Sequence, residues 1–229
     1  MSRLYLHQEL LLLTLNDSKG TFEGGMYLYG VAGAVLSELL LQGRIKTSED
    51  DKQIVTIAEN SPTGDEILDE VVQLIRESAK PRPLKHWVSK VANIRELKHQ
   101  IAEQLCKKGV LQKDEKKILW LFTQRIYPEA NSSVEDEIRQ RMGELMFQPD
   151  QKGDERTTVL VAFAKCSNVL NANFAKVELQ QHRNRIEEIS KGDLLATQAT
   201  QATIASVQAA ITAATVATTI AATTAATAN

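Results

Sequence analysis

The sequence has few of the residues that build extracellular scaffolds or enzyme sites. Its two cysteines, Cys106 and Cys166, lie far apart in helical apolar patterns, which favours two reduced, buried thiols over a disulfide. The four histidines are scattered, and the sequence contains no zinc-type spacing of His and Cys, no glycine-rich phosphate loop and no nucleophile elbow. These absences argue against an enzyme, and we predict no catalytic residue, no metal site and no cofactor.

The sequence also lacks a stretch with the length and flanks of a signal peptide or a membrane-spanning helix. The most apolar N-terminal run, residues 10–13, is bracketed by Glu9 and Thr14, and no small-residue cleavage pattern follows it. Together with reduced cysteines, this predicts a cytoplasmic location. The Asn-x-Ser sequons at Asn16 and Asn131 are therefore interpreted as turn and helix-cap residues.

The spacing of apolar residues predicts a mainly α fold, a single helical domain with two small β-hairpins and an Ala/Thr-rich C-terminal tail. Helices are expected at residues 6–15, 26–41, 65–78, 84–108, 131–147, 155–170 and 175–190, and hairpins at 44–57 and 110–127. No charged residue follows Asp193, so we assign residues 1–192 to the domain and 193–229 to a low-complexity, partly helical tail. This tail has too little apolar bulk to predict a firm docking face.

Residues 84–108 are the most informative stretch, because their polar side gathers cations. On a continuous helix, Arg95, Lys98 and His99 are surface neighbours at spacings of three and four residues. Residues 81–117 hold ten Lys or Arg and four Asp or Glu, a net charge of +6, whereas the whole chain has 27 basic and 29 acidic residues. A local basic patch on a nearly neutral protein predicts an anionic partner. The alternative interpretation is an ordinary solvated helix face.

A series of short blocks occurs in one order and covers most of residues 5–180. The blocks are residues 9–13 with Asp17 and Gly20, residues 36–39 with 43–45, residues 62–65 with 68–70, residues 108–111, and residues 164–175. This collinear set resembles the Golgi phosphoprotein 3 family, whose members are mainly helical cytosolic proteins that dock on membranes by binding phosphatidylinositol 4-phosphate.

The resemblance implies a lipid-headgroup site at Arg95 and Lys98, the positions of the two arginines that hold the lipid phosphate in the family. Lys98 keeps the positive charge but loses the guanidinium fork that binds a phosphate through two hydrogen bonds. The family's aromatic position falls on Glu23 and its remaining arginine position on Ala32. The resemblance therefore leaves the headgroup open, and an anionic phospholipid, with a phosphoinositide as one candidate, is the expected partner.

The second membrane element implied by the resemblance is the hairpin carrying Leu119, Trp120, Leu121 and Phe122. It matches by position an apolar hairpin that serves membrane insertion and self-association in the family. Tryptophan favours interfaces that are apolar on one side and wet on the other. We expect membrane contact or homo-oligomerisation through this hairpin. The alternative is that one face of the hairpin packs on the core and nothing protrudes.

The sequence as a whole therefore predicts a non-enzymatic, peripheral membrane protein that binds anionic lipid. One alternative is an adaptor that recognises cytosolic tails of membrane enzymes, as the family does. A winged-helix-like nucleic-acid binder is disfavoured, because basic residues are not interleaved around Trp120. A long arginine-bearing N-terminal arm is missing and the loop before Arg95 is short, which is typical of a compact, prokaryotic version. A Golgi location is expected only if the source is eukaryotic.

Overall fold

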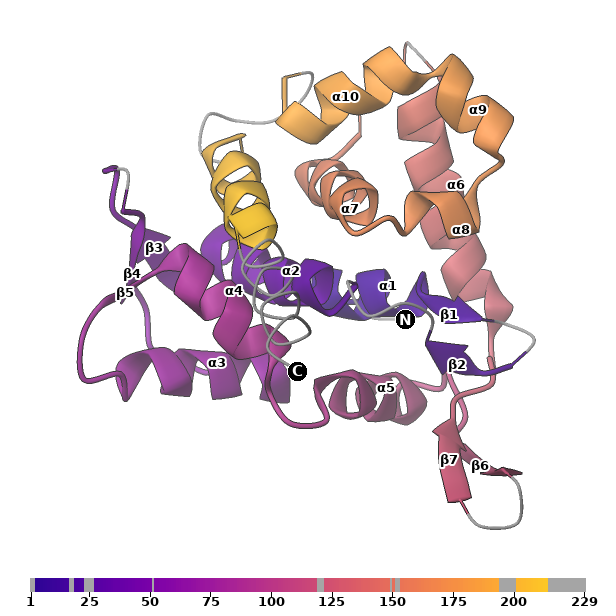
Figure 1. The fold of residues 1–229 in the computed structure, drawn as a ribbon, viewed down its shortest axis with the longest axis horizontal. Coiled ribbons are helices and arrows are strands. Elements are labelled where there is room, and N and C mark those ends of the chain that lie inside the picture. The colour runs from indigo at the N-terminus through magenta and orange to yellow at the C-terminus, as the bar shows by residue number, and fades with distance from the viewer. Residues whose placement is uncertain are drawn as a thin grey trace, which may run out of the picture.

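Helix α2 (Tyr27–Leu41) lies at the centre of the molecule in this computed structural model, because its sequence is apolar on every side. All of residues 30–39 are buried. Helices α1 (Leu6–Leu12), α4 (Leu84–Ala92) and α7 (Glu155–Cys166) pack around it. The core is therefore formed by helices from the beginning, middle and later part of the chain (Figure 1).

The structure describes residues 3–16, 19–22, 27–50, 52–118, 122–148, 150, 153–193 and 201–213. The other helices are α3 (Glu66–Arg76), α5 (Leu97–Lys107), α6 (Ser132–Phe147), α8 (Leu170–Asn173), α9 (Lys176–Gln181), α10 (Arg183–Lys191) and a last helix at residues 201–213. The strands are β1 (Leu15–Asn16), β2 (Thr21–Phe22), β3 (Ile45–Thr47), β4 (Ile54–Ile57), β5 (Arg82–Pro83), β6 (Asp114–Ile118) and β7 (Phe122–Ile126). The mainly α fold class is confirmed.

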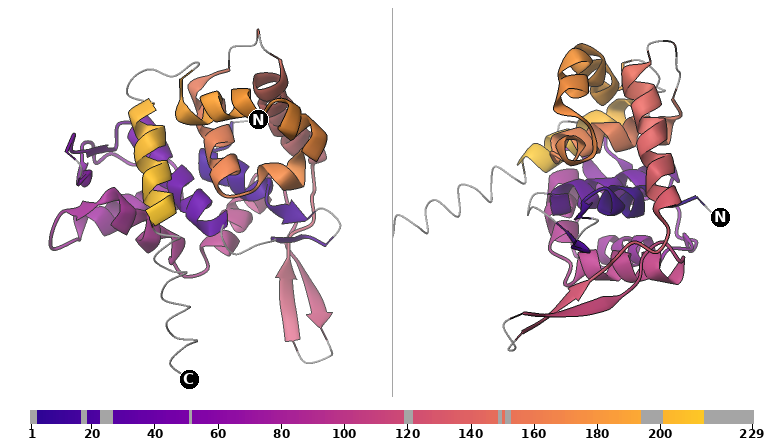
Figure 2. Two further views of the ribbon diagram at one scale, coloured as in Figure 1. Left: turned by 45° about the horizontal axis from the view of Figure 1, so that its top comes forward. Right: turned by 90° about the vertical axis from the view of Figure 1, so that its right-hand side faces the viewer.

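The strands form small antiparallel pairs rather than a central sheet. Both predicted hairpins are present, as β3–β4 and β6–β7. Strand β5 adds a third strand to the first of them, and β1 pairs with β2 across the turn that was predicted to end the first helix. The β6–β7 hairpin projects from the helical body (Figures 1 and 2).

Three helix caps satisfy amide groups at helix N-termini, and the one at Asn131 confirms the prediction. The carboxylate of Asp65 accepts hydrogen bonds from the first turn of α3. Asn131 caps α6, and Asp154 caps α7. Gly192 ends α10 with a φ of 77°, a left-handed conformation that glycine adopts without steric cost.

The continuous helix expected at residues 84–108 is wrong. Helix α4 ends at Ala92 and α5 begins at Leu97, with Glu96 in a left-handed conformation at a φ of 62°. The side-chain amide of Asn93 donates a hydrogen bond to the backbone carbonyl oxygen of Ser89 at 2.7 Å. An asparagine side chain that hydrogen-bonds nearby backbone favours a helix end over helix propagation. The amphipathic pattern persists through the break, because both helices bury their apolar side.

Three further helices differ from expectation. Helix α1 ends at Leu12 rather than at residue 15, which lies in β1. Helix α7 ends at Cys166, and Asn168 follows it with a φ of 60°. The helix expected at residues 175–190 is divided into α9 and α10 at His182. These ends lie within apolar patterns of the right period, so the periodicity alone did not locate them.

The helix at residues 201–213 docks on the core, contrary to the expectation that this segment lacks the bulk for a docking face. Ile204, Val207 and Ile211 are buried. They approach α2 at Gly33, where an added Cβ would lie 2.6 Å from the Cδ1 of Ile211 and 2.9 Å from a Cγ of Val207. The missing side chain at Gly33 therefore lets three sparse apolar residues reach the core.

A buried ion pair connects the central helices. The carboxylate of Glu38 on α2 accepts hydrogen bonds from the amide of Leu6 at 2.9 Å and from Arg156 of α7 at 2.6 Å. Burial by itself raises the pKa of Glu38, but the hydrogen bonds from Arg156 and Leu6 outweigh it and lower the pKa below its ordinary value. Glu38 therefore stays ionised and joins α1, α2 and α7.

We predict that Glu38→Gln lowers the free energy of unfolding by about 3 kcal/mol, because it leaves the Arg156 charge partly buried without its partner. Glu66→Gln, which breaks the exposed pair with Lys107, should cost less than about 1 kcal/mol. Urea unfolding measures both free energies.

The contribution of Glu38 to stability should also depend on pH. Because folding lowers the pKa of Glu38, its contribution to the free energy of unfolding exists above the unfolded pKa and disappears as pH falls through the folded pKa. The gap between wild type and Glu38→Gln should therefore shrink from about pH 7 to about pH 3; a constant gap would contradict the ion-pair explanation.

We also predict a strong coupling between Gly33 and the helix at residues 201–213. Gly33→Ala gains up to about 1 kcal/mol of helix propensity but overpacks against Val207 and Ile211, so the two effects offset each other. In the Val207→Ala/Ile211→Ala background the clash is absent, and the same substitution should stabilise. A double-mutant cycle by urea unfolding measures this coupling, and strictly additive effects would refute the contact.

Candidate functional site

A small hollow lies where β2, α5 and the β6–β7 hairpin meet. Its volume is about 260 Å³, and it is lined by Thr21, Phe22, Lys98, His99, Thr123, Gln124 and Arg125. Two of these side chains are permanent cations, and the threonine and glutamine side chains can donate hydrogen bonds. Among the described residues that line it there is no carboxylate. The hollow therefore has the chemistry of an anion site.

Lys98 and His99 enter the hollow from the first turn of α5. This helix begins at Leu97 after the left-handed Glu96, and no side-chain cap hydrogen bond closes its N-terminus. The N-terminal end of a helix carries partial positive charge from its unpaired amide groups. In α5, however, the amides of Leu97 and His99 already donate to the carbonyl oxygens of Ile94 and Glu96 at 3.2 and 2.8 Å, so the positive charge at the hollow is mainly that of its cationic side chains.

The two aromatic rings that line the hollow, Phe22 and His99, lie against the ring of the buried Tyr127. The Nδ1 atom of His99 lies 2.9 Å from the Tyr127 hydroxyl, and the ring of Phe22 lies 5.7 Å from the Tyr127 ring. Burial, with the nearby charge of Lys98, lowers the pKa of His99. His99 is therefore neutral at neutral pH and acts there as a polar, uncharged wall.

Arg125 comes from strand β7, on the opposite side of the hollow from α5. Its guanidinium forms an ion pair with Glu96, the residue that immediately precedes α5. The side chains of Arg125 and Glu96 are 36% and 46% exposed, so both remain accessible to a ligand. This ion pair connects the hairpin to the start of α5.

Of the two predicted headgroup residues, Lys98 lines the hollow, whereas Arg95 lies in the turn between α4 and α5. Arg95 therefore does not share a helical face with Lys98 and His99, as the continuous helix would have required. Its side chain is exposed, and its carbonyl oxygen accepts a hydrogen bond from Gln100 at 3.0 Å. Within the described ranges, neither Arg95 nor Lys98 forms an ion pair with a carboxylate.

Of the two positions that depart from the family pattern, Ala32 and Glu23, the structure describes only Ala32. Ala32 is completely buried in α2 and belongs to the core. Glu23 lies outside the described residues. Arg125, which the sequence did not single out, lines the hollow instead. A basic residue after the hairpin turn was a visible signal, but the residues of β2 and α5 that share the hollow with it are distant in sequence.

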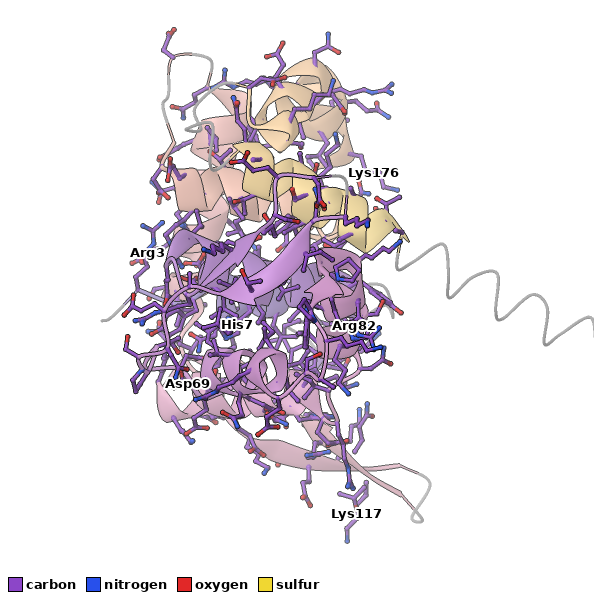
Figure 3. All side chains as sticks on the ribbon, turned by 90° about the vertical axis from the view of Figure 1, so that its left-hand side faces the viewer. Arg3, His7, Asp69, Arg82, Lys117 and Lys176 are labelled. Carbon is purple, nitrogen blue, oxygen red and sulfur yellow. The ribbon has the colours of Figure 1, made fainter. Side chains whose placement is uncertain are left out.

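Further exposed cations lie on α4 and β5. The outer face of α4 presents Lys85, His86 and Lys90, and Arg82 precedes it. Burial, followed by the charges of Arg82 and Lys90, lowers the pKa of His86, which places these charges close together. Figure 3 shows Arg82 on the side of the molecule toward which the hairpin projects beyond Lys117, with Arg3 on the other side.

The described part of the hairpin is polar and exposed. Residues 114–117 and residues 123–124 are exposed, and the ladder ends at the pair Ile118 and Phe122. The predicted membrane-contacting residues Leu119, Trp120 and Leu121 lie outside the described residues, as does the side chain of Phe122. The hairpin therefore presents a polar base, and the predicted role of its tip stays a prediction.

A larger hollow of about 650 Å³ lies between the N-terminal segment and α6, but its charges are largely paired with one another. Arg3 pairs with Asp154 at 3.0 Å, and Arg141 pairs with the buried Glu9 at 2.6 Å. Lys108 donates to the side-chain oxygen of Gln8 at 2.7 Å. These contacts join the N-terminal segment and α1 to α5, α6 and α7, so they are explained by the fold.

The described residues contain neither a membrane-spanning helix nor a metal-type cluster of side chains. None of the helices described is both long enough and apolar enough to cross a membrane. In the same part of the chain, no three His, Cys, Asp or Glu side chains are grouped so that they could hold a metal ion.

The chain is similar in sequence to known proteins over most of its length. The family model described as Golgi phosphoprotein 3 (GPP34) matches residues 6–217. The chain is similar to the vacuolar protein sorting-associated protein 74 of Eremothecium gossypii, with 28% identity over 160 residues, which cover 61% of this chain and 48% of the relative. It is also similar to the protein of the same name from Schizosaccharomyces pombe, with 27% identity over 161 residues, 61% of this chain and 47% of the relative.

The aligned region thus spans about half the length of these curated relatives. The family model, in contrast, covers nearly the whole chain, including the helix at residues 201–213 and all three elements around the hollow. The protein therefore belongs to the Golgi phosphoprotein 3 family.

Proposed function

We propose that this protein is a non-enzymatic peripheral membrane protein that binds anionic phospholipid. In this proposal, the hollow lined by Lys98 holds the headgroup, and the exposed Arg95, three residues earlier, contributes a second positive charge. The observation that carries the proposal is the hollow itself, which gathers Lys98 and Arg125 with hydrogen-bond donors and has no carboxylate among its described lining residues. Family membership supports the same function. A phosphoinositide is the first candidate ligand, and other anionic lipids are the alternatives.

Electrostatic attraction to the bilayer adds to this contact. A cation close to an anionic membrane contributes about 1 kcal/mol to binding. Arg82, Lys85 and Lys90 are exposed, and Figure 3 places Arg82 on the side toward which the hairpin projects. In this proposal, that side faces the membrane, and the hairpin tip at Leu119, Trp120, Leu121 and Phe122 inserts into it or contacts another copy of the chain.

The proposed location is the surface of a membrane that faces the cytoplasm, and the Golgi if the source is eukaryotic. An adaptor that binds the cytosolic tails of membrane enzymes is compatible with the same placement, because lipid contact would hold it beside such tails. Pull-down of tail peptides with hairpin variants would separate this role from lipid binding. Loss of tail capture without loss of vesicle binding would favour the adaptor.

We predict that Arg95→Ala combined with Lys98→Ala weakens binding to anionic vesicles by about 2 kcal/mol, since two cations near the membrane are lost. Vesicle co-sedimentation with and without phosphatidylinositol 4-phosphate measures the effect. The matched control is Lys46→Ala combined with Arg3→Ala, which removes the same charge from exposed positions outside the hollow, with Arg3 on the side away from Arg82 in Figure 3. Equal binding by the two double variants would remove the proposed site.

We predict that Trp120→Ala also weakens vesicle binding, but with little dependence on ionic strength. An inserted aromatic ring contributes through apolar contact and interfacial placement, which salt does not screen, whereas the contribution of Arg95 and Lys98 is screened. Co-sedimentation across a salt series separates the two. If Trp120→Ala leaves binding unchanged and also leaves the oligomeric state unchanged, the hairpin has neither proposed role.

The same salt series with duplex DNA tests the nucleic-acid alternative. Binding to duplex DNA through phosphate contacts falls steeply with salt. Tighter binding to DNA than to anionic vesicles, with such a slope, would overturn the lipid proposal.

A further inference from the structure

We propose that Arg125 supplies the second cation of the anion site, and that Glu96 is the carboxylate it must leave when a phosphate group binds. This inference rests on the proposed lipid-binding function and assigns residues to it that the family comparison does not. It identifies the bound group as a phosphate monoester held between α5 and the hairpin.

The first argument is the chemistry that the hollow would otherwise lack. Lys98 is a point charge without a planar fork, and Ala32 is buried and uncharged. Arg125 lines the same hollow as Lys98. A guanidinium presents parallel N–H donors that match two oxygens of a phosphate. Arg125 therefore restores the bidentate donor from a different element of the fold.

The second argument is size and donor content. A hollow of about 260 Å³ is smaller than the usual pocket for a drug-sized molecule, about 300 to 1,000 Å³. It suits a headgroup phosphate rather than an acyl chain. The hydroxyl groups of Thr21 and Thr123 and the amide of Gln124 lie on its wall, so oxygens not bound by the two cations have further donors available.

The third argument is the ion pair between Arg125 and Glu96. Both side chains are more than one third exposed, and an exposed ion pair of this kind is weak. A phosphate monoester carries more negative charge than a carboxylate and three acceptor oxygens. It would therefore displace Glu96 from Arg125 with little opposition.

The exchange also couples the site to the hairpin. Without ligand, Glu96 connects Arg125 of β7 to the start of α5. With ligand, the phosphate would connect Arg125 to Lys98 instead. Lys98 lies in the first turn of α5, two residues after Glu96. The hairpin that carries the predicted membrane-contacting tip is thus held to α5 in both states, but by the ligand in one of them.

The test compares three single variants of the full chain. Arg125→Ala should weaken binding of a soluble inositol phosphate by about tenfold, as expected for losing a hydrogen-bonded charge, and Arg125→Lys should recover only part of it. Glu96→Gln should strengthen binding, because it removes the competitor. Isothermal titration calorimetry with soluble ligand measures these effects without contributions from bilayer charge.

Two charge-matched controls make the test specific. Lys116→Ala removes a cation from the same hairpin outside the hollow, and Glu178→Gln removes an exposed carboxylate of α9, away from the hollow. Both should change soluble-ligand binding little. If Arg125→Ala behaves like Lys116→Ala, or Glu96→Gln behaves like Glu178→Gln, the assignment is overturned. Circular dichroism melting identifies any variant that fails to fold, and in that case Arg125→Lys and Glu96→Gln decide the question.

The source of the phosphate is decided by three probes. These are phosphatidylcholine vesicles with phosphatidylinositol 4-phosphate, the soluble inositol phosphate, and inorganic phosphate. Preference for the vesicles and the inositol phosphate supports a lipid headgroup, whereas equal affinity for inorganic phosphate overturns that source. Loss of binding in Arg95→Ala/Lys98→Ala but not in Arg125→Ala would leave the proposed function standing and remove only the role of Arg125.

Discussion

The fold depends on one constraint, which is that helix α2 is apolar apart from Ser37 and the single charge of Glu38 and must be covered from every direction. Helices α1, α4 and α7 cover most of it. The helix at residues 201–213 covers the position where Gly33 leaves space. Burial of apolar surface is the dominant favourable contribution to folding, so even a segment with few large side chains is recruited when the surface it meets is flat enough.

The buried and exposed charges of this protein have different roles. Glu38 and Arg156 are surrounded by the core, satisfy each other and the Leu6 amide, and so position three helices. Lys98 and Arg125 lie at the rim, where α5 and the hairpin meet, and contribute little to the core. Charges that are accessible and incompletely neutralised are available to a ligand, whereas buried pairs are already satisfied. This difference separates the small basic hollow from the larger hollow beside Arg3.

The family pattern and the structure place the cations of the site on different elements. The family resemblance implies a basic residue at position 32, but Ala32 is part of the packed core. Arg125 reaches the hollow from β7, across from α5. A side chain on a projecting hairpin can face α5 without disturbing the core. An anion site can therefore keep its chemistry while one of its cations comes from a different strand or helix.

The sequence by itself determined the helical class, the central apolar helix, the caps at Asp65, Asn131 and Asp154, and the excess of positive charge before the hairpin. These follow from local periodicity, hydrogen-bonding side chains and composition. Only the tertiary structure decided the helix break at Glu96, the docking of residues 201–213, and the approach of Arg125 to Lys98. Each of these depends on contacts between residues distant in sequence, or on a balance between local backbone conformations. Apolar periodicity is equally consistent with one long helix and with two.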